Sequence, residues 1–221
     1  MTVLLVLATF IILLLIDYFY SRRLTEQEEP RAVRPESPPL LLSFVGGFRL
    51  PEHLRYHPGH TWALSESPNL VRVGLDDFAA RLIGKAERIQ LPQRGQWVRQ
   101  GQKILTVQKD GGRVDMVSPI EGIVTDINQA VAQDPSLANR DPYGDGWLVT
   151  VQAPDVPTNF RNLLSGAVAR KWMEEAAARL RSRLPALAGA VAQDGGVAVD
   201  DLASHLPAHD WSELAREFFL S

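Results

Sequence analysis

Six short segments rich in β-forming residues follow one another closely in the middle of the chain, with little helical pattern between them. Each segment is bounded by residues that favour turns, mainly Gly, Pro, Asn and Asp. Strands spaced in this way are typical of an antiparallel sandwich or barrel, so we predict a mainly β fold. The segments are 70–74, 87–92, 103–108, 113–117, 122–127 and 147–152.

One short helix interrupts this β pattern. Residues 76–83 read Asp-Asp-Phe-Ala-Ala-Arg-Leu-Ile, and Gly84 follows them. A carboxylate at the first position accepts hydrogen bonds from the free N–H groups of a helix start, and glycine is the usual stop signal. The expected body is therefore a small barrel-like sandwich with one helix beside it.

The N-terminus predicts a membrane anchor. Residues 3–16 are apolar except for Thr9, and Arg22 and Arg23 close the stretch. Twenty helical residues span about 30 Å, one hydrocarbon core, so residues 1–20 are expected to form a single transmembrane helix. A cleaved signal peptide would need basic residues before the stretch and a small-residue cleavage site after it. The arginines follow the span, which predicts a body on the cytoplasmic side of the inner membrane.

Composition excludes several classes of protein. The formal net charge of -3 argues against nucleic-acid binding, which needs a basic surface. The chain has no cysteine, which removes disulfides, thiolate nucleophiles and cysteine-based metal sites. Residues 21–50 are rich in Arg, Glu and Pro and are expected to be a linker, with the β domain at 51–156 and a helical extension at 157–221.

Five motifs in the β region occur in the order found in the glycine cleavage system H protein family, which they resemble. The resemblance implies the lipoyl or biotinyl hammerhead, a flattened antiparallel barrel-sandwich hybrid that carries lipoate on a lysine. The motifs are Tyr-His-Pro-Gly-His-Thr-Trp at 56–62, Val-Gly-Leu-Asp-Asp-Phe-Ala at 73–79, Leu-Pro-Gln-Arg-Gly at 91–95, Ser-Pro-Ile-Glu-Gly at 118–122 and Asn-Arg-Asp-Pro-Tyr-Gly-Asp-Gly-Trp at 139–147.

The chain departs from the family where the carrier lysine belongs. Counting back from Ser118 without a gap puts Gly111 in the place of that lysine, and glycine cannot form an amide with lipoate. Asp110-Gly111 is a strong signal for a tight hairpin turn. Lys109 lies two residues early, so we consider it a less favoured carrier and expect Lys109 and Arg113 to be solvated residues beside the turn. The expected bound cofactor is none.

The sequence shows no catalytic constellation, and the protein is not expected to be an enzyme. His53, His57 and His60 have helical spacing, but Pro58 and Gly59 interrupt that helix, so we predict no metal site. Asp141 and Asp145 flank a segment too short for a calcium loop and are expected to shape a turn.

The C-terminal region changes to a helical pattern. An apolar stripe runs from Phe160 through Val168 to Leu184, and arginines occupy the rest of that helix. The arginines form either a solvated face or a contact with anionic headgroups or an acidic partner. A last helix is expected at 211–220 with Asp210 as its cap, and its apolar face either packs on the body or docks into a partner. The candidate partner-binding residues are Arg179, Arg181, Arg183, Trp211, Phe218 and Phe219.

These observations favour a non-catalytic, membrane-tethered H-like domain that serves as a structural subunit of a larger membrane complex, for example a bioenergetic one. Its expected partners are the other subunits and the bilayer, through residues 1–20. Two alternatives stay open: a lipoyl or acyl carrier that uses a displaced lysine, and a periplasmic adaptor of the membrane-fusion type.

Overall fold

The computed structural model describes residues 42–109, 112–183, 201–202 and 208–219. The chain divides into two units, Met1–Pro39 and Leu40–Ser221, and every described residue belongs to the second unit. Within the described residues no helix is long and apolar enough to cross a membrane. The span expected at residues 1–20 lies outside the described part.

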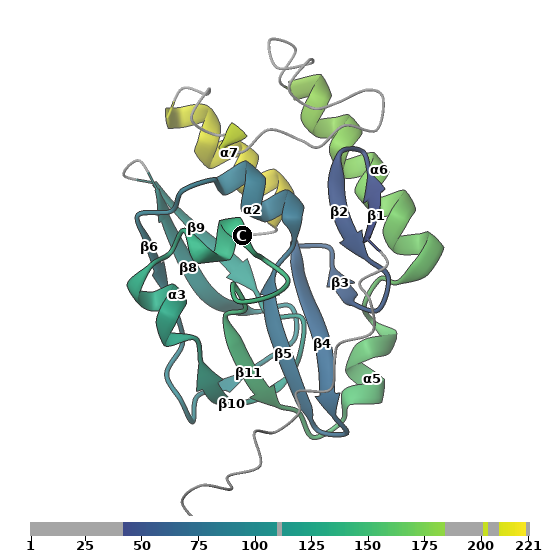
Figure 1. Ribbon diagram of the computed structural model, residues 1–221, viewed down its shortest axis with the longest axis vertical. Coiled ribbons are helices and arrows are strands. Elements are labelled where there is room, and N and C mark those ends of the chain that lie inside the picture. Colours follow the sequence, from purple (N-terminus) through teal and green to yellow (C-terminus); the bar gives the residue numbers. More distant parts are fainter. Residues whose placement is uncertain (1–41, 110–111, 184–200, 203–207, 220–221) are drawn as a thin grey trace, which may run out of the picture. The chain divides into compact units, whose positions relative to one another are not determined.

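The described residues form three antiparallel sheets (Figure 1). The first is a hairpin of β1 (Leu42–Val45) and β2 (Phe48–Pro51). The second has the order β3-β4-β5-β11-β10-β7 and contains Arg55–His57, Thr61–Ser67, Leu70–Leu75, Val149–Gln152, Gly122–Ile127 and Trp97–Val98, respectively. The third has the order β6-β8-β9 and contains Arg88–Gln90, Lys103–Lys109 and Gly112–Val117.

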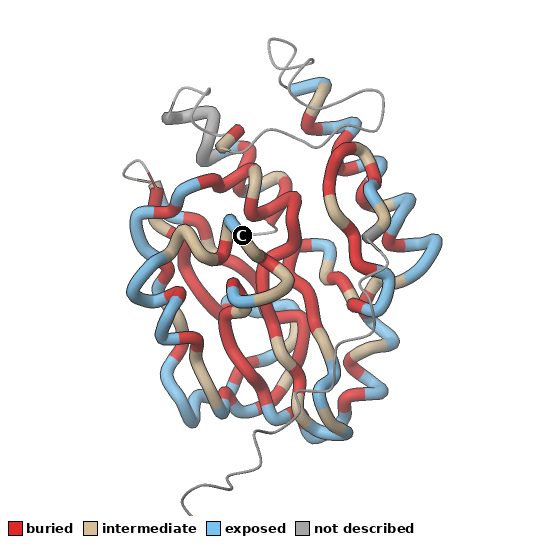
Figure 2. The backbone as a smooth tube through the Cα atoms, in the orientation of Figure 1, coloured by how far each residue is buried: buried red, intermediate tan, exposed pale blue. Residues whose placement is uncertain are grey.

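The core lies between the inner faces of these sheets. On β5, Val71 and Val73 are fully buried while Leu70 and Arg72 are only partly buried, the alternation expected of a strand with one face inside. Val124 of β10 and Met116 of β9 fill the same core, and Figure 2 shows the buried strands running through the middle of the body. The predicted mainly β, antiparallel fold is confirmed, since the sheets form a curled half-barrel with helices beside it.

The predicted helix is present as α2 (Asp77–Ile83) with both of its end signals. The Asp76 carboxylate accepts a hydrogen bond from the Ala79 N–H at 2.8 Å. Gly84 has a φ of 65°, and its N–H donates to the Ala80 carbonyl at 2.8 Å. A Cβ at Gly84 would lie 2.4 Å from Asp201 Oδ1, so glycine is also needed there for a close packing contact.

Two short helices were not predicted. α3 (Gln129–Gln133) and α4 (Leu137–Arg140) lie between β10 and β11. Asn128 caps α3 by accepting hydrogen bonds from Ala130 and Val131. Segments of four or five residues are too short to show helical periodicity in the sequence.

The predicted boundary between linker and body is wrong. Residues 42–50, which we assigned to the linker, form most of the β1–β2 hairpin. Gly46 and Gly47 both have positive φ and allow the tight turn between the strands. Gly46 lies so close to α6 (Gly166–Arg183) that a Cβ would be 2.5 Å from Ala177, and Val45, Phe48 and Leu50 are buried.

The continuous helix predicted from Phe160 to Leu184 is also wrong. α5 (Val156–Arg161) ends before α6 begins at Gly166. Between them Leu164 forms a β-bridge with Tyr56, with N···O distances of 2.8 and 2.9 Å, and this bridge breaks the helix. Gly166 then starts α6 with a φ of 53°. α6 buries Met173, Ala176 and Leu180, but Val168, which we placed in the apolar stripe, is 62% exposed.

The last helix, α7 (Ala208–Phe219), begins before its predicted start. Asp210, expected as the cap, lies inside the helix. α7 packs against β9, and Figure 1 shows it beside α2 and the β8–β9 hairpin. Leu214, Ala215, Phe218 and Phe219 are buried. The Trp211 side chain lies outside the described residues.

Candidate functional site

The hairpin that would present a carrier lysine is formed by β8 and β9. Lys109 at the end of β8 pairs directly with Gly112 at the start of β9, so only residues 110 and 111 connect the two strands. Asp110 and Gly111 themselves lie outside the described residues. The register nevertheless agrees with a two-residue turn at the predicted position.

Lys109 is buried, which corrects our expectation that it is a solvated residue. Its side chain is 4% exposed. The Nζ atom donates a hydrogen bond to the Ile83 carbonyl at 2.6 Å and forms an ion pair with Asp201. Arg113 is exposed, as expected. The ammonium group is held by two acceptors, whereas an amide at Nζ has no positive charge and only one N–H. Its formation would therefore leave Asp201 without its cation and at least one of the two acceptors without a donor.

Asp201 is positioned by the end of α2. The Asp201 side chain packs on Gly84, and any side chain at position 84 would collide with it. The Asp201 backbone has a φ of 59°. The next residue, Leu202, is completely buried. The Lys109 ammonium therefore lies between the last turn of α2 and a segment that is 92 positions away in sequence.

We expect Lys109 to react slowly with an amine-acetylating reagent at neutral pH. Lys103 of the same strand is the internal control, because its side chain is 58% exposed and its ion pair with Asp115 lies at the surface. Peptide mass spectrometry after brief labelling measures both residues in one sample. Equal labelling of Lys109 and Lys103 would contradict the burial described above.

The C-terminal helix closes the region beside this hairpin. The Phe219 ring meets the His60 ring edge-on at 6.0 Å between centroids, and His60 also stacks on Phe78 at 4.1 Å. The Phe219 carbonyl approaches Gly59 so closely that a Cβ there would be 3.1 Å away. Phe218 packs on Phe78 with centroids 5.1 Å apart. Two of the candidate partner-binding residues, Phe218 and Phe219, are therefore buried within the chain itself.

His53, His57 and His60 make different side-chain contacts. His60 is buried, and its Nδ1 lies 2.8 Å from Asp76 Oδ2. His57 Nδ1 accepts a hydrogen bond from the Gly59 N–H at 3.0 Å, and burial together with the charge of His60 lowers the pKa of His57. Partial burial also lowers the pKa of His53. In the described part of the chain no group of three potential metal ligands comes together.

A buried carboxylate joins the β1–β2 hairpin to the rest of the body. Asp77 accepts two hydrogen bonds from the Arg49 guanidinium, at 2.7 and 2.9 Å, and one from the Arg49 N–H at 2.9 Å. Arg81 donates a further bond at 2.9 Å. Sequence reasoning missed this network because Arg49 lies in the segment that we assigned to the linker.

Tyr143, from the motif at 139–147, adds to the same network. Its hydroxyl donates to the Arg49 carbonyl at 2.7 Å and accepts from the Asp77 N–H at 2.9 Å. Desolvation raises the pKa of Tyr143, and the negative charges of Asp76 and Asp77 act in the same direction. The hydroxyl therefore stays protonated at neutral pH and can keep donating.

Asp141 shapes the loop of that motif, as predicted, and Asp145 contributes its backbone N–H. The Asp145 N–H donates to the Asp141 carboxylate at 2.8 Å, and the Gly146 N–H donates to the Asp141 carbonyl at 2.9 Å. A Cβ at Gly144 would lie 2.1 Å from Asp141 Oδ2, so only glycine fits this tight loop.

The arginines of α6 make contacts within the chain. Arg179 lies over the Phe218 ring at 5.7 Å, and Arg183 forms an ion pair with Glu217 at 2.9 Å. Arg181 is half-buried near the turn at Gly46. The acids that balance this face come from other elements, such as Glu217 of α7 and Glu52, which pairs with Arg170 at 3.1 Å. A single helix read in isolation cannot reveal such partners.

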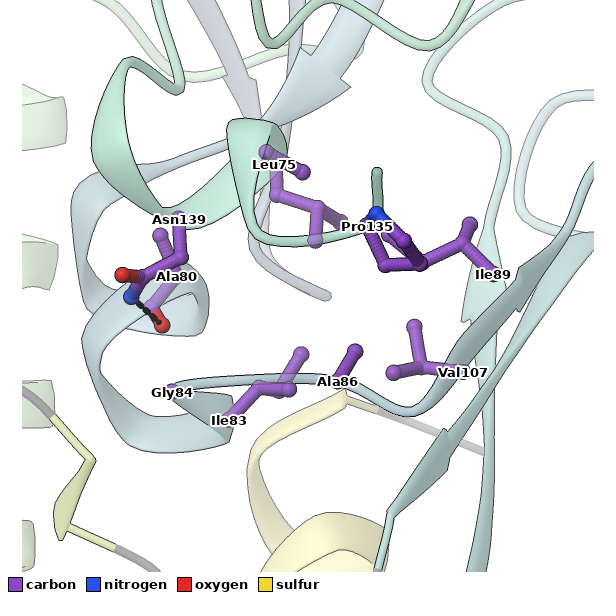
Figure 3. Close-up of a pocket in the computed structure, with 10 residues that line it drawn as sticks. Leu75, Ala80, Ile83, Gly84, Ala86, Ile89, Val107, Pro135 and Asn139 are labelled. Carbon is purple, nitrogen blue, oxygen red and sulfur yellow. Dashed lines mark hydrogen bonds between the residues drawn. The ribbon is translucent and has the colours of Figure 1, made fainter. Parts of the chain in front are cut away.

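A small apolar cavity lies between α2, α4 and the third sheet (Figure 3). Leu75, Ile83, Ile89 and Val107 line it, and the Asn139 amide donates to the Ala80 carbonyl at its edge at 2.7 Å. The cavity measures about 10 Å³, which is at most the space that a single water molecule needs. This cavity is therefore a packing gap and not a ligand site.

Sheet topology, the β8–β9 hairpin and the loop at 139–147 define a lipoyl-type hammerhead domain with an added C-terminal cover. Residues 54–176 match the family model described as glycine cleavage H-protein. This match covers more than half of the chain, so the chain belongs to the glycine cleavage H-protein family.

Individual relatives agree with this assignment. The glycine cleavage system H protein of Legionella pneumophila (strain Corby) is 38% identical over 51% of this chain and 88% of its own length. That of Anaeromyxobacter sp. (strain K) is 32% identical over 57% of this chain and 97% of its own. The crystal structure of a glycine cleavage system H protein from Mycobacterium marinum superimposes with a TM-score of 0.50 at 28% identity, covering 57% of this chain and 98% of that one.

Proposed function

We propose that this protein is a membrane-tethered, non-catalytic member of the H-protein family that does not carry lipoate and serves as a structural subunit of a membrane complex. The observation that supports the proposal most strongly is the burial of the Lys109 side chain. Lys109 is the lysine nearest to the family's carrier position, and its Nζ is buried against Ile83 and Asp201. Gly111, at the carrier position itself, has no side chain to modify.

Lipoate does not fit the residues present. A carrier group must leave the surface of its domain to reach other proteins, whereas the Lys109 ammonium points inward to a backbone carbonyl and a carboxylate. The alternative carrier role through a displaced lysine would require both contacts to break and the 201–202 segment to move. Intact mass after co-expression with a lipoyl ligase separates the two functions, because only a carrier gains the lipoyl mass.

The tether is proposed from the apolar run at residues 3–16 and the arginines that follow it. We expect the full-length protein to stay in the membrane fraction after extraction with alkaline carbonate, because a transmembrane helix resists such extraction. The control is the unit Leu40–Ser221 alone, which should appear in the supernatant. Full-length protein in the supernatant would contradict the proposed anchor.

The side of the membrane is tested separately. We expect a reporter that is active only in the cytoplasm to be active when it is fused after Ser221. Activity of a periplasmic reporter at the same position would overturn the proposed topology and favour the adaptor alternative.

A further inference from the structure

The outer face of the third sheet is polar and carries a groove that α7 completes. The groove has a volume of about 450 Å³. Gln90 of β6, Lys103 and Thr106 of β8, and Arg113 and Asp115 of β9 line one side, while Ala215 and Arg216 of α7 line the other. Because α7 lies beyond the family match at 54–176, the added C-terminal helix creates this groove.

Positive charge predominates in the groove. The Asp115 carboxylate forms an ion pair with Lys103 at 2.8 Å and accepts a hydrogen bond from Thr106 at 2.7 Å, and the charge of Arg113 also attracts it. Among the described residues no carboxylate forms an ion pair with Arg113 or Arg216, and both arginines are exposed. Two guanidinium groups therefore remain available for an anionic ligand.

The charges are spread along the sheet. Arg88 of β6 lies opposite Gln108 of β8, which in turn lies opposite Arg113 of β9, so the three side chains share one face. Neighbouring strands are about 4.8 Å apart, which places Arg88 and Arg113 about 10 Å from each other. Arg88 lies outside the residues that line the groove. The distance corresponds to about three residues of an extended chain, so a segment that leaves the groove across the sheet meets Arg88 about three residues after Arg113.

We propose that this groove binds an extended acidic segment of a partner protein, with its carboxylates on Arg113 and Arg216. The inference deepens the proposed role as a subunit and rests on it. Arg216 is the determining addition, because it brings a second exposed guanidinium to the groove from outside the matched residues 54–176. The segment is recognised by its spaced negative charges, and its binding weakens as salt screens them.

Full-length protein in a non-ionic detergent is titrated into fluorescein-labelled hexaglutamate, and fluorescence anisotropy reports binding. Hexaglutamine is the uncharged control peptide and should not bind. The double variant Arg113→Gln/Arg216→Gln should bind hexaglutamate about tenfold more weakly, since two charge-assisted hydrogen bonds are lost. The matched control Arg94→Gln/Arg140→Gln removes two exposed arginines that pair with Asp126 and Asp134 elsewhere, and should change affinity by less than about twofold.

A charge-reversed variant keeps the test informative. The variant Arg113→Glu/Arg216→Glu should no longer bind hexaglutamate and should instead bind hexalysine. A variant that had only lost its folded structure would bind neither peptide. Equal weakening in the control variant, or no binding by the unmodified protein, would overturn the proposal. Displacement of hexaglutamate by inorganic tripolyphosphate at much lower concentration would assign the groove to small polyphosphates instead. If peptide binding fails while carbonate extraction behaves as expected, only the groove assignment is wrong.

Discussion

Replacing Phe219 with alanine is expected to lower the free energy of unfolding of residues 40–221 by about 3–5 kcal/mol. The Phe219 side chain is completely buried and meets His60 edge-on, so the substitution removes buried apolar area and leaves a cavity. Urea denaturation followed by tryptophan fluorescence measures the change.

Phe44→Ala is the matched control for this experiment. The Phe44 side chain is 45% exposed on β1, so its truncation should cost less than about 1 kcal/mol. If Phe219→Ala costs no more than Phe44→Ala, the C-terminal helix does not pack on the body in solution. That outcome would restore the hypothesis that α7 docks into a partner.

Replacing Asp77 with alanine is expected to destabilise the body by a similar amount, about 3–5 kcal/mol. Asp77 is fully buried, and its carboxylate compensates the charges of Arg49 and Arg81, whose side chains are largely buried. Removing one partner of such a network leaves the others without compensation, and the Arg49 N–H also loses its acceptor.

Asp126→Ala serves as the comparison for Asp77→Ala. Asp126 pairs with Arg94, and both side chains are about half exposed or more, so the pair should contribute no more than about 1 kcal/mol. Urea unfolding of both variants compares a buried with an exposed ion pair. Equal effects would mean that the β1–β2 hairpin is not held by Asp77.

Six strands (β5, β6, β8, β9, β10 and β11) and α2 could be predicted because their signals are local, whereas β1 to β4 and β7 were not among the predicted segments. The β segments of residues 70–152 alternate with turn residues, and Asp76 and Gly84 mark both ends of α2 within the sequence itself. The position of the hairpin turn could also be predicted, from Asp110-Gly111. The pairing of Lys109 with Gly112 agrees with it, because it leaves only two connecting residues.

The features that were missed depend on contacts between distant residues. The burial of Lys109 requires Asp201, and neither residue carries a local signal for the other. The break between α5 and α6 arises from the bridge of Leu164 with Tyr56, which overrides a helical pattern that continues through it. Arg49 was assigned to a linker by composition, although its ion pair with Asp77 holds it in the body.

For the C-terminal aromatic residues the sequence predicted part of the outcome. Their apolar spacing correctly indicated that they must be covered, but spacing alone does not identify the cover. The structure places Phe218 and Phe219 against Phe78 and His60 of the same chain. The interior of the family domain thus continues into an extension that lies outside the matched residues 54–176.

The most direct test of the non-carrier function is the intact mass of the protein after co-expression with an active lipoyl ligase and added lipoate. We expect the unmodified chain to show no added lipoyl mass, because Lys109 is held by Ile83 and Asp201 and position 111 is glycine. Gly111→Lys restores a lysine at the family's carrier position and should acquire the modification, as should an H protein that carries lipoate. A lipoyl group on Lys109 of the unmodified chain would contradict the proposed function.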